Sequence, residues 1–134
     1  MAGLLAAGVL LAACGTHSGG GSPNPSTSAV TQLSITARSA ATAPAQTWTL
    51  TCDPAGGSHP DPVAACAALA KATDPFSPTP PDRACTMIYG GAQTATITGT
   101  YRGRTVDASY SRTNGCEIAR WDAIAAVLVI PGGA

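Results

Sequence analysis

The sequence predicts an α+β domain: a mostly antiparallel β-sheet of about five strands, with one main helix and a short second helix packed on one face. Three observations support this fold class. Several short segments alternate apolar and polar side chains, one Ala-rich segment carries the signals of a helix start, and five cysteines are present. Because aromatic residues make up only 4% of the chain, the core is thin and gains from covalent cross-links.

Two strands are predicted first. Between residues 32 and 39, Leu33 and Ile35 alternate with polar side chains, and between residues 46 and 52 Trp48 and Leu50 do the same. The Gly- and Pro-rich residues 53–61 then form a turn-rich loop.

A helix is predicted over residues 62–70. Asp61 is a good N-cap, and Pro62 suits the first helical position because its missing N–H is not needed there. The residues expected on one face of this helix are Val63, Cys66, Leu69 and Ala70. The prolines of residues 73–83 then require irregular structure.

Alternation predicts two further strands over residues 92–101 and 105–112, joined by a turn at residues 102–104. A short helix fits residues 116–122. Residues 123–130 are predicted as a closing strand, although their composition also permits a helix.

The charge balance excludes two classes of partner. Seven Lys and Arg residues face seven Asp and Glu residues, so the formal net charge is zero. A nucleic-acid-binding protein needs a basic surplus to neutralise phosphates, and binding to an anionic membrane surface needs a polybasic stretch. This sequence has neither feature. We therefore expect no nucleic acid as partner and no electrostatic binding to a membrane surface.

The N-terminus has the pattern of an export signal. Residues 2–13 form an uninterrupted run of small and aliphatic side chains that is shorter than the roughly 20 residues needed to span a bilayer. It ends in Leu11-Ala12-Ala13-Cys14, which resembles a bacterial lipobox and implies a diacylglycerol on the Cys14 sulfur. One departure is that the first basic residue is Arg38, and the alternative is a buried N-terminal helix with an incidental cysteine.

These features predict three parts: a signal peptide over residues 1–13, a lipidated Cys14 with a flexible linker through residue 28, and a folded domain over residues 29–134. The expected location is extracytoplasmic, with the chain held at the cell membrane through its lipid anchor only. Release to the exterior is a further option.

Export places the other four cysteines in an oxidising compartment, where disulfides form, and four cysteines allow three connectivities. Their spacing lacks the short C-x2-C pairs typical of zinc sites. We expect no metal and no cofactor.

An enzyme is not predicted. The only histidine within the predicted domain is His59, in a loop, where it more often orders the chain than performs chemistry. A nucleophile elbow and a phosphate-binding glycine loop are both missing from the sequence. The aspartates stand in turn contexts, where they cap backbone amides.

The domain resembles the Streptomyces subtilisin inhibitor family. The family's pattern has G-x-H-P between its first two cysteines, a C-x-[MK]-V-Y reactive segment, then G-x-W-x-G-[KR]-x-V and N-x-C-E. The matching segments here are Gly57-Ser58-His59-Pro60, Cys85-Thr86-Met87-Ile88-Tyr89, Gly99 through Val106, and Asn114-Gly115-Cys116-Glu117.

The resemblance implies a serine protease inhibitor with the scissile bond Met87-Ile88 on an exposed, substrate-like loop. It implies that Cys85, Thr86 and Tyr89 flank this bond, and that the disulfides are Cys52–Cys66 and Cys85–Cys116. The implied partner is an extracellular serine protease of the subtilisin or chymotrypsin type, whose hydrophobic pocket suits Met87. A homodimer formed sheet on sheet is also suggested.

Two departures from the family keep alternatives open. Gly90-Gly91 replaces the Asp-Pro that usually follows the tyrosine, which adds chain entropy to the loop. The C-terminal segment is aliphatic where the family has an aromatic strand. The alternatives are a non-inhibitory surface lipoprotein that uses this scaffold to bind another protein, and a core strand containing Met87 and Ile88.

Overall fold

The computed structural model describes residues 30–130, which form one four-stranded sheet and two helices. The strands are β1 (Thr31–Arg38), β2 (Gln46–Cys52), β3 (Thr94–Tyr101) and β4 (Arg104–Tyr110), and the helices are α2 (Pro62–Lys71) and α3 (Gly115–Ala123). The strand order is β2-β1-β3-β4, and every neighbouring pair is antiparallel. The predicted α+β class is confirmed, with four strands in place of about five.

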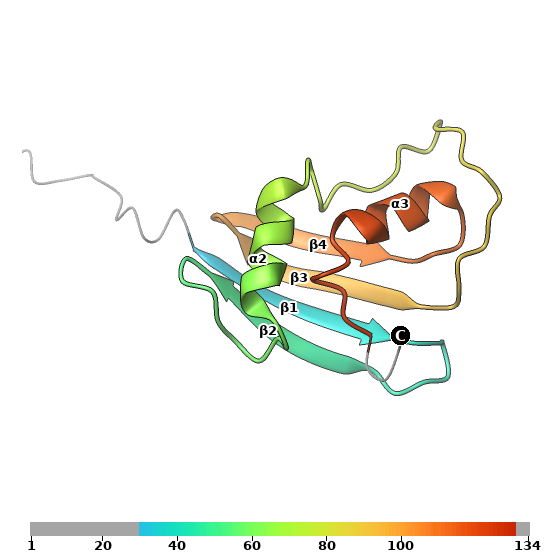
Figure 1. Cartoon of the computed structure of the whole chain (residues 1–134). Helices are drawn as coiled ribbons and strands as arrows, with labels where there is room; N and C mark the ends of the chain where they lie inside the picture. The colour runs from blue at the N-terminus through green and yellow to red at the C-terminus, as the bar shows by residue number, and fades with distance from the viewer. Residues whose placement is uncertain (1–29, 131–134) are drawn as a thin grey trace, which may run out of the picture.

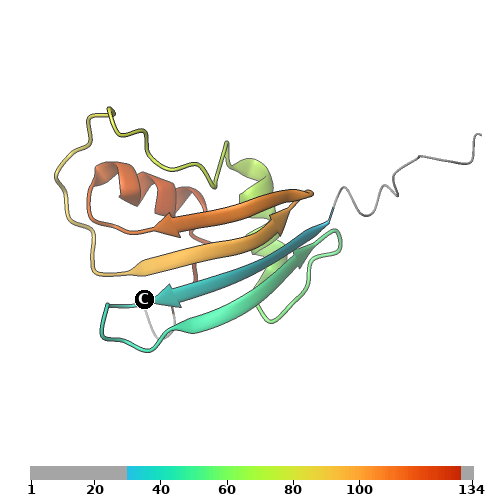
Figure 2. The ribbon, with the colours of Figure 1, turned by 180° about the vertical axis from the view of Figure 1, so that it is seen from behind.

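Both helices lie on the same face of the sheet (Figure 1), and the view from behind shows the opposite face open (Figure 2). The core is therefore a single layer between the sheet and the helices. Its largest fully buried side chains are Leu33, Ile35, Leu50, Leu69, Ile97, Ile124, Val127 and Leu128.

The alternation of β1 decides which face is buried. Ile35 has no exposed surface and pairs with Trp48 of β2 and Ile97 of β3. The residues between the buried ones point to the open face, where the Thr36 and Thr47 hydroxyls lie 3.0 Å apart. The open face is thus lined by small, uncharged hydroxyl side chains at its centre.

A two-residue turn joins β3 to β4. Tyr101 pairs with Arg104, and the intervening Arg102 and Gly103 have φ values of 49° and 82°. Positive φ at both central residues is the requirement of the type I′ turn, whose twist matches that of the strands. Arg102 adopts this conformation with its guanidinium 5.1 Å from the Tyr101 ring centre.

Helix α2 begins as predicted, because the Asp61 carboxylate accepts the Ala64 N–H at 3.1 Å and Pro62 opens the first turn. The face predicted to be buried is partly wrong. Ala65 and Leu69 are buried, whereas Val63 is 70% exposed, and Ala70 is exposed as well. Small alanine side chains orient a helix weakly, so the orientation follows Leu69 and the disulfide that ties α2 to the end of β2.

The predicted closing strand over residues 123–130 is wrong, because α3 ends at Ala123, residues 124–127 form turns and residues 128–130 form no strand. The Val127 N–H donates to the Ile124 carbonyl at 2.8 Å, and Ile124, Val127 and Leu128 are at most 2% exposed. Together with Trp121 of α3 they recur at spacings of three and four residues, so their apolar side chains continue the buried helix face into the core.

His59 holds this C-terminal segment in place. The imidazole is only 4% exposed, its Nδ1 accepts the Asp61 N–H at 3.0 Å, and its Nε2 lies 3.0 Å from the Val127 carbonyl oxygen. Because Nδ1 is an acceptor, Nε2 carries the proton and donates to Val127. The predicted role of His59 in ordering the loop is confirmed.

The start of β1 and the loop that leads into β3 lie at opposite ends of the sheet, as both ribbon views show (Figures 1 and 2). Within residues 30–130, neither helix combines the length and the apolarity that a bilayer crossing requires. The predicted signal peptide, the lipidated Cys14 and the linker fall outside the described residues.

Candidate functional site

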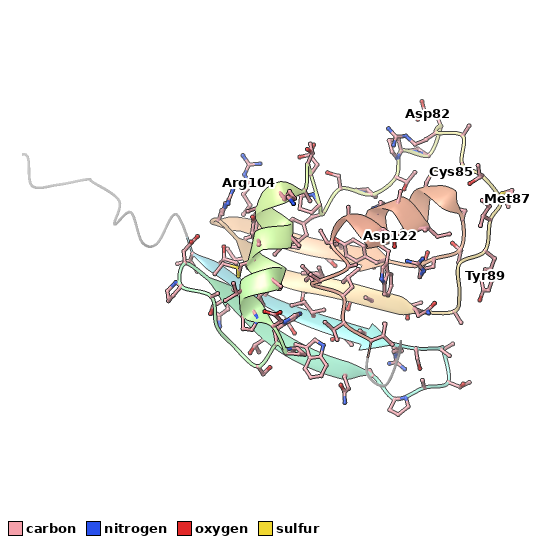
Figure 3. The ribbon with its side chains drawn as sticks, viewed as in Figure 1. Asp82, Cys85, Met87, Tyr89, Arg104 and Asp122 are labelled. Atoms are coloured by element: carbon pink, nitrogen blue, oxygen red, sulfur yellow. A yellow bond between two sulfur atoms is a disulfide. The ribbon has the colours of Figure 1, made fainter. Side chains whose placement is uncertain are left out.

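Residues 84–91 form an extended loop that passes the first turn of α3 and leads into β3 (Figure 3). Three consecutive large side chains at its centre are exposed: Met87 at 89%, Ile88 at 60% and Tyr89 at 67%. Met87 and Tyr89 point away from the body of the domain (Figure 3). The alternative in which Met87 and Ile88 belong to a core strand is therefore wrong.

The backbone of these three residues is also unpaired. Among residues 30–130, no hydrogen bond reaches the N–H or the carbonyl of Met87, Ile88 or Tyr89. An extended segment with free backbone donors and acceptors can pair with another protein as an added strand. The loop thus offers both apolar side chains and an unpaired main chain.

The chain before Met87 is anchored to the start of α3 by two bonds. Cys85 forms a disulfide with Cys116, with the two Cα atoms 5.3 Å apart. The Gly115 N–H donates to the Thr86 carbonyl at 2.9 Å. The second disulfide, Cys52–Cys66, lies in the β2–α2 part of the fold, so both bridges match the pairing that the family resemblance implies.

The chain after Tyr89 is anchored to the segment between β4 and α3. The Gly90 N–H donates to the Arg112 carbonyl at 2.7 Å. Gly90 also packs so closely on α3 that a Cβ there would stand 2.7 Å from the Ile118 side chain. The loop is therefore held on both sides of its exposed centre by the α3 region.

Helix α3 owes its fixed start to a local cap. The Asn114 side chain accepts the Glu117 N–H at 3.0 Å, which satisfies one of the free amides of the first turn. Glu117 in that turn also places a negative charge at the positive end of the helix dipole. The two residues that anchor the chain before Met87, Gly115 and Cys116, stand in this capped turn.

The Pro-rich segment of residues 73–83 is bonded to the same helix. Thr79 donates its hydroxyl to the Glu117 carboxylate at 2.7 Å, and Arg120 donates to the Ser77 carbonyl at 3.0 Å. Glu117 and Arg120 form an ion pair at 2.9 Å, and their side chains are 19% and 16% exposed. This partly buried network holds the segment that precedes the loop.

Tyr110 at the end of β4 also holds the Pro-rich segment of residues 73–83. Its hydroxyl donates to the Pro75 carbonyl at 2.6 Å, and the Arg120 guanidinium lies 4.6 Å from its ring centre. Burial raises the pKa of Tyr110 to about 12, although the positive charge of Arg120 opposes this shift. The hydroxyl therefore stays a hydrogen-bond donor over the ordinary pH range.

Beside these hydrogen bonds, a cleft of about 690 Å³ lies between the Pro-rich segment and α3 and reaches Cys85 and Thr86. Side chains therefore do not fill the space behind this part of the loop. The rigidity of residues 84–91 therefore depends on the hydrogen bonds that hold both ends of the loop and on the Cys85–Cys116 disulfide.

The structure brings Cys85, Thr86, Met87, Ile88 and Tyr89 together with Cys116, as the sequence implied. The predicted hairpin tip is separate, since Arg104 lies at the far side of the domain from Met87 (Figure 3). Sequence reasoning missed the anchoring roles of Arg112 and Gly115. The position of Gly115 directly before Cys116 could have indicated that it lies near the loop, whereas nothing in the sequence around Arg112 indicates its role.

Comparison with known proteins adds an independent observation. A family profile described as subtilisin inhibitor-like matches residues 13–114. Subtilisin inhibitor-like protein 8 of Streptomyces virginiae is 42% identical over 76 residues, which cover 53% of this chain and 68% of that protein. Subtilisin inhibitor-like protein 1 of Streptomyces cacaoi is 37% identical over 94 residues, which cover 66% of this chain and 84% of that protein.

A solved structure is also similar. It is that of sermetstatin from Streptomyces caespitosus in complex with subtilisin from Bacillus licheniformis. The match covers 73% of this chain and 96% of that chain, with 26% identity and a TM-score of 0.47.

Proposed function

Because this chain belongs to the subtilisin inhibitor-like family, a family of protease inhibitors and not of enzymes, we propose that residues 84–91 are its reactive loop and Met87-Ile88 its reactive bond. The proposed target is a subtilisin-type serine protease. The observation that carries the assignment is the exposure of Met87, Ile88 and Tyr89 between two anchored chain segments.

The exposure of three large side chains in a row supports a role in binding. Large apolar side chains are usually buried, and a contiguous exposed group of them marks an interaction site. Tyr89 follows these two residues, and the next two positions, Gly90 and Gly91, have no side chain that could obstruct an approaching enzyme. The loop is thus already extended and exposed before a protease binds.

In the proposed complex the loop lies in the enzyme's active site as a substrate would. Cys85 and Thr86 pair their backbone with the enzyme as an added strand, and the Met87 side chain fills the primary specificity pocket. The enzyme's serine attacks the Met87 carbonyl carbon, and the Ile88 nitrogen is the leaving group. A flexible, uncharged methionine fits a broad hydrophobic pocket, so chymotrypsin-type proteases are a second class of target.

Inhibition requires that the loop be released slowly in cleaved form. An already ordered loop loses little conformational entropy on binding, so more of the contact energy appears as affinity. If the bond is cut, the Thr86 and Cys85 anchors retain the new acyl end, and the Gly90 anchor retains the new amine. The amine then stays close to the acyl carbon, and resynthesis competes with release.

The alternative function is that of a non-inhibitory surface lipoprotein whose scaffold binds another protein. The pair Gly90-Gly91 favours it, because two glycines loosen the chain on the leaving-group side. Titration of subtilisin with the purified chain separates the two functions. A linear, stoichiometric loss of activity supports the inhibitor, and full activity at a tenfold excess of the chain supports the alternative.

We also propose that the protein is exported and held at the cell membrane by a lipid on Cys14. The support is the sequence Leu11-Ala12-Ala13-Cys14 after a short apolar run. Expression in a bacterial host with radiolabelled palmitate tests this. Label on the wild-type chain and its loss in Cys14→Ser would support the anchor, and equal labelling of both would contradict it.

A sheet-on-sheet homodimer is the remaining partner we propose. The supporting feature is the open sheet face (Figure 2), on which the hydroxyls of Thr36 and Thr47 lie 3.0 Å apart. Sedimentation equilibrium at micromolar concentration tests it. A dimer mass that Thr36→Lys converts to a monomer mass is expected, and a monomer mass for the wild type would contradict it.

A further inference from the structure

The leaving-group side of the loop contains the feature least suited to an inhibitor. Gly90 and Gly91 follow Tyr89 directly, and Gly91 has a φ of 129°, which side-chain-bearing residues rarely adopt. Glycine leaves the backbone more freedom than any other residue. Without an additional constraint, the segment that carries the new amine would move away after cleavage.

The side chain of Arg112 supplies a constraint there. Its Nε donates to the Gly90 carbonyl at 3.2 Å, while the Gly90 N–H donates to the Arg112 carbonyl at 2.7 Å. Both polar backbone groups of Gly90 are thus bonded to the same residue. This reciprocal pair fixes the two peptide units that meet at Gly90, three residues after Met87.

Arg112 is itself held from two directions. Its Nη1 donates to the Asp122 carboxylate at 2.8 Å, and its guanidinium lies 5.9 Å from the ring centre of Trp121. Trp121 is only 5% exposed, and both partners belong to α3. The planar guanidinium can bond a carbonyl and a carboxylate simultaneously, which a lysine ammonium on a flexible stem does less rigidly.

The same helix also anchors the chain before Met87, through Gly115 and Cys116 in its first turn. The chain is therefore held against α3 on both sides of the Met87-Ile88 bond. A backbone hydrogen bond and a disulfide hold the segment before the bond, and Arg112 holds the segment after it. A Cβ at residue 90 would stand 2.7 Å from the Ile118 side chain, which would have to shift to admit it.

We propose that Arg112 is a positioning residue for the reactive bond: by clamping Gly90 to α3, it retains the Ile88 amine beside the acyl carbon and offsets the freedom of Gly90-Gly91. The inference rests on the proposed inhibitory function. It deepens that function, because it explains the loop's resistance to cleavage by the action of Arg112, which lies outside the loop.

The test compares Arg112→Ala, Arg112→Lys and Asp122→Asn with Arg104→Ala, a matched arginine at the hairpin tip, in the full chain carrying Cys14→Ser. Three quantities are measured with subtilisin: the inhibition constant, the rate at which Met87-Ile88 is cut, and the ratio of cleaved to intact chain at equilibrium. Thermal unfolding of each variant reports stability separately.

For Arg112→Ala we expect the equilibrium ratio of cleaved to intact chain and the inhibition constant each to rise about tenfold, the effect of losing a charge-assisted hydrogen bond. Arg112→Lys and Asp122→Asn should fall between this variant and the wild type, and Arg104→Ala should match the wild type. A purely structural role would lower the unfolding temperature and leave the cleavage equilibrium of the folded chain unchanged.

Two outcomes overturn the inference in distinguishable ways. If the wild type inhibits subtilisin and all Arg112 and Asp122 variants keep its cleavage equilibrium, Arg112 does not position the bond, and the inhibitory function stands. If the wild type does not inhibit subtilisin, the proposed function fails and the inference fails with it. Should Arg112→Ala not fold, Asp122→Asn alone decides, since Asp122 is an exposed partner whose side chain is 61% accessible.

Discussion

The Gly115 N–H donates to the Thr86 carbonyl at 2.9 Å, and Gly115 lies so close that a Cβ there would overlap the Thr86 hydroxyl. Gly115 therefore does two things for the residue before Met87: it fixes its carbonyl and leaves space for its side chain. Thr86 would have to turn its side chain, or shift its backbone, to accommodate any larger residue at 115.

We expect Gly115→Ala to weaken inhibition of subtilisin by about fivefold, because the displaced Thr86 loses a hydrogen bond worth about 1 kcal/mol. Unfolding should change little, since alanine is favoured over glycine in a helix. The inhibition constant and the thermal midpoint check this. Gly56→Ala, which would bring a Cβ to 3.0 Å from the Thr51 hydroxyl far from the loop, is the matched control and should leave inhibition intact.

Substitution of Met87 should change the specificity and leave the fold unaffected. Its side chain is 89% exposed, so Met87→Lys and Met87→Gly should alter stability by no more than about 0.5 kcal/mol. Met87→Gly should weaken subtilisin inhibition about thirtyfold, as for an interface anchor worth about 2 kcal/mol. Met87→Lys should gain inhibition of trypsin, whose acidic pocket pairs with a cation. Unchanged subtilisin inhibition in Met87→Gly would show that another residue occupies the pocket.

The two disulfides should differ in what their loss does. Replacing both cysteines of either bridge with serine should cost about 3 to 4 kcal/mol of unfolding free energy in the chain-entropy model. Only loss of Cys85–Cys116 should also accelerate cutting of Met87-Ile88, because that bridge is two residues from the bond. Loss of Cys52–Cys66 serves as the control for general destabilisation. Equal cleavage rates in the two variants at matched folded fractions would contradict the proposed role of the bridge at the loop.

Tyr110 predicts an alkaline limit to stability. Burial raises its pKa in the folded chain to about 12, whereas in the unfolded chain the phenol has the ordinary value of about 10. Between these values the unfolded chain has released the proton and the folded chain still holds it. Stability contributed by the group is therefore fully present below pH 10 and is lost as the pH rises toward 12.

The expected loss amounts to roughly 2 kcal/mol and can be followed by urea unfolding between pH 9 and pH 12. Tyr110→Phe removes the titrating group and the bond to the Pro75 carbonyl. That variant should be less stable at pH 8 and should show a smaller fall above pH 10. An identical alkaline fall in both proteins would assign the effect to other groups.

The sequence predicted those elements in which local signals agree. The alternation of Leu33 and Ile35 marked β1, and the cap at Asp61 with Pro62 marked the start of α2. These patterns depend on neighbours within a few residues, so they can be read without knowledge of the fold. The short helix after Asn114 was likewise indicated, and the structure extends it by one residue at each end.

The errors came from residues whose position depends on distant partners. The aliphatic segment after α3 reads equally well as a strand or a helix, and the buried bond from His59 to Val127 keeps it irregular. The exposed Met87 and Ile88 also resemble core residues by composition, and only the family resemblance pointed to their exposure. Arg112 could not be recognised because its partners, Gly90 and Asp122, are brought together by the fold.

The placement of the loop at the end of the sheet opposite to the start of β1 gives the molecule a direction. If Cys14 is acylated as proposed, the chain is fastened near one pole and offers Met87 at the other. The chain would then enter the domain at the end away from Met87, so the anchor would leave the approach of a protease to the loop unobstructed.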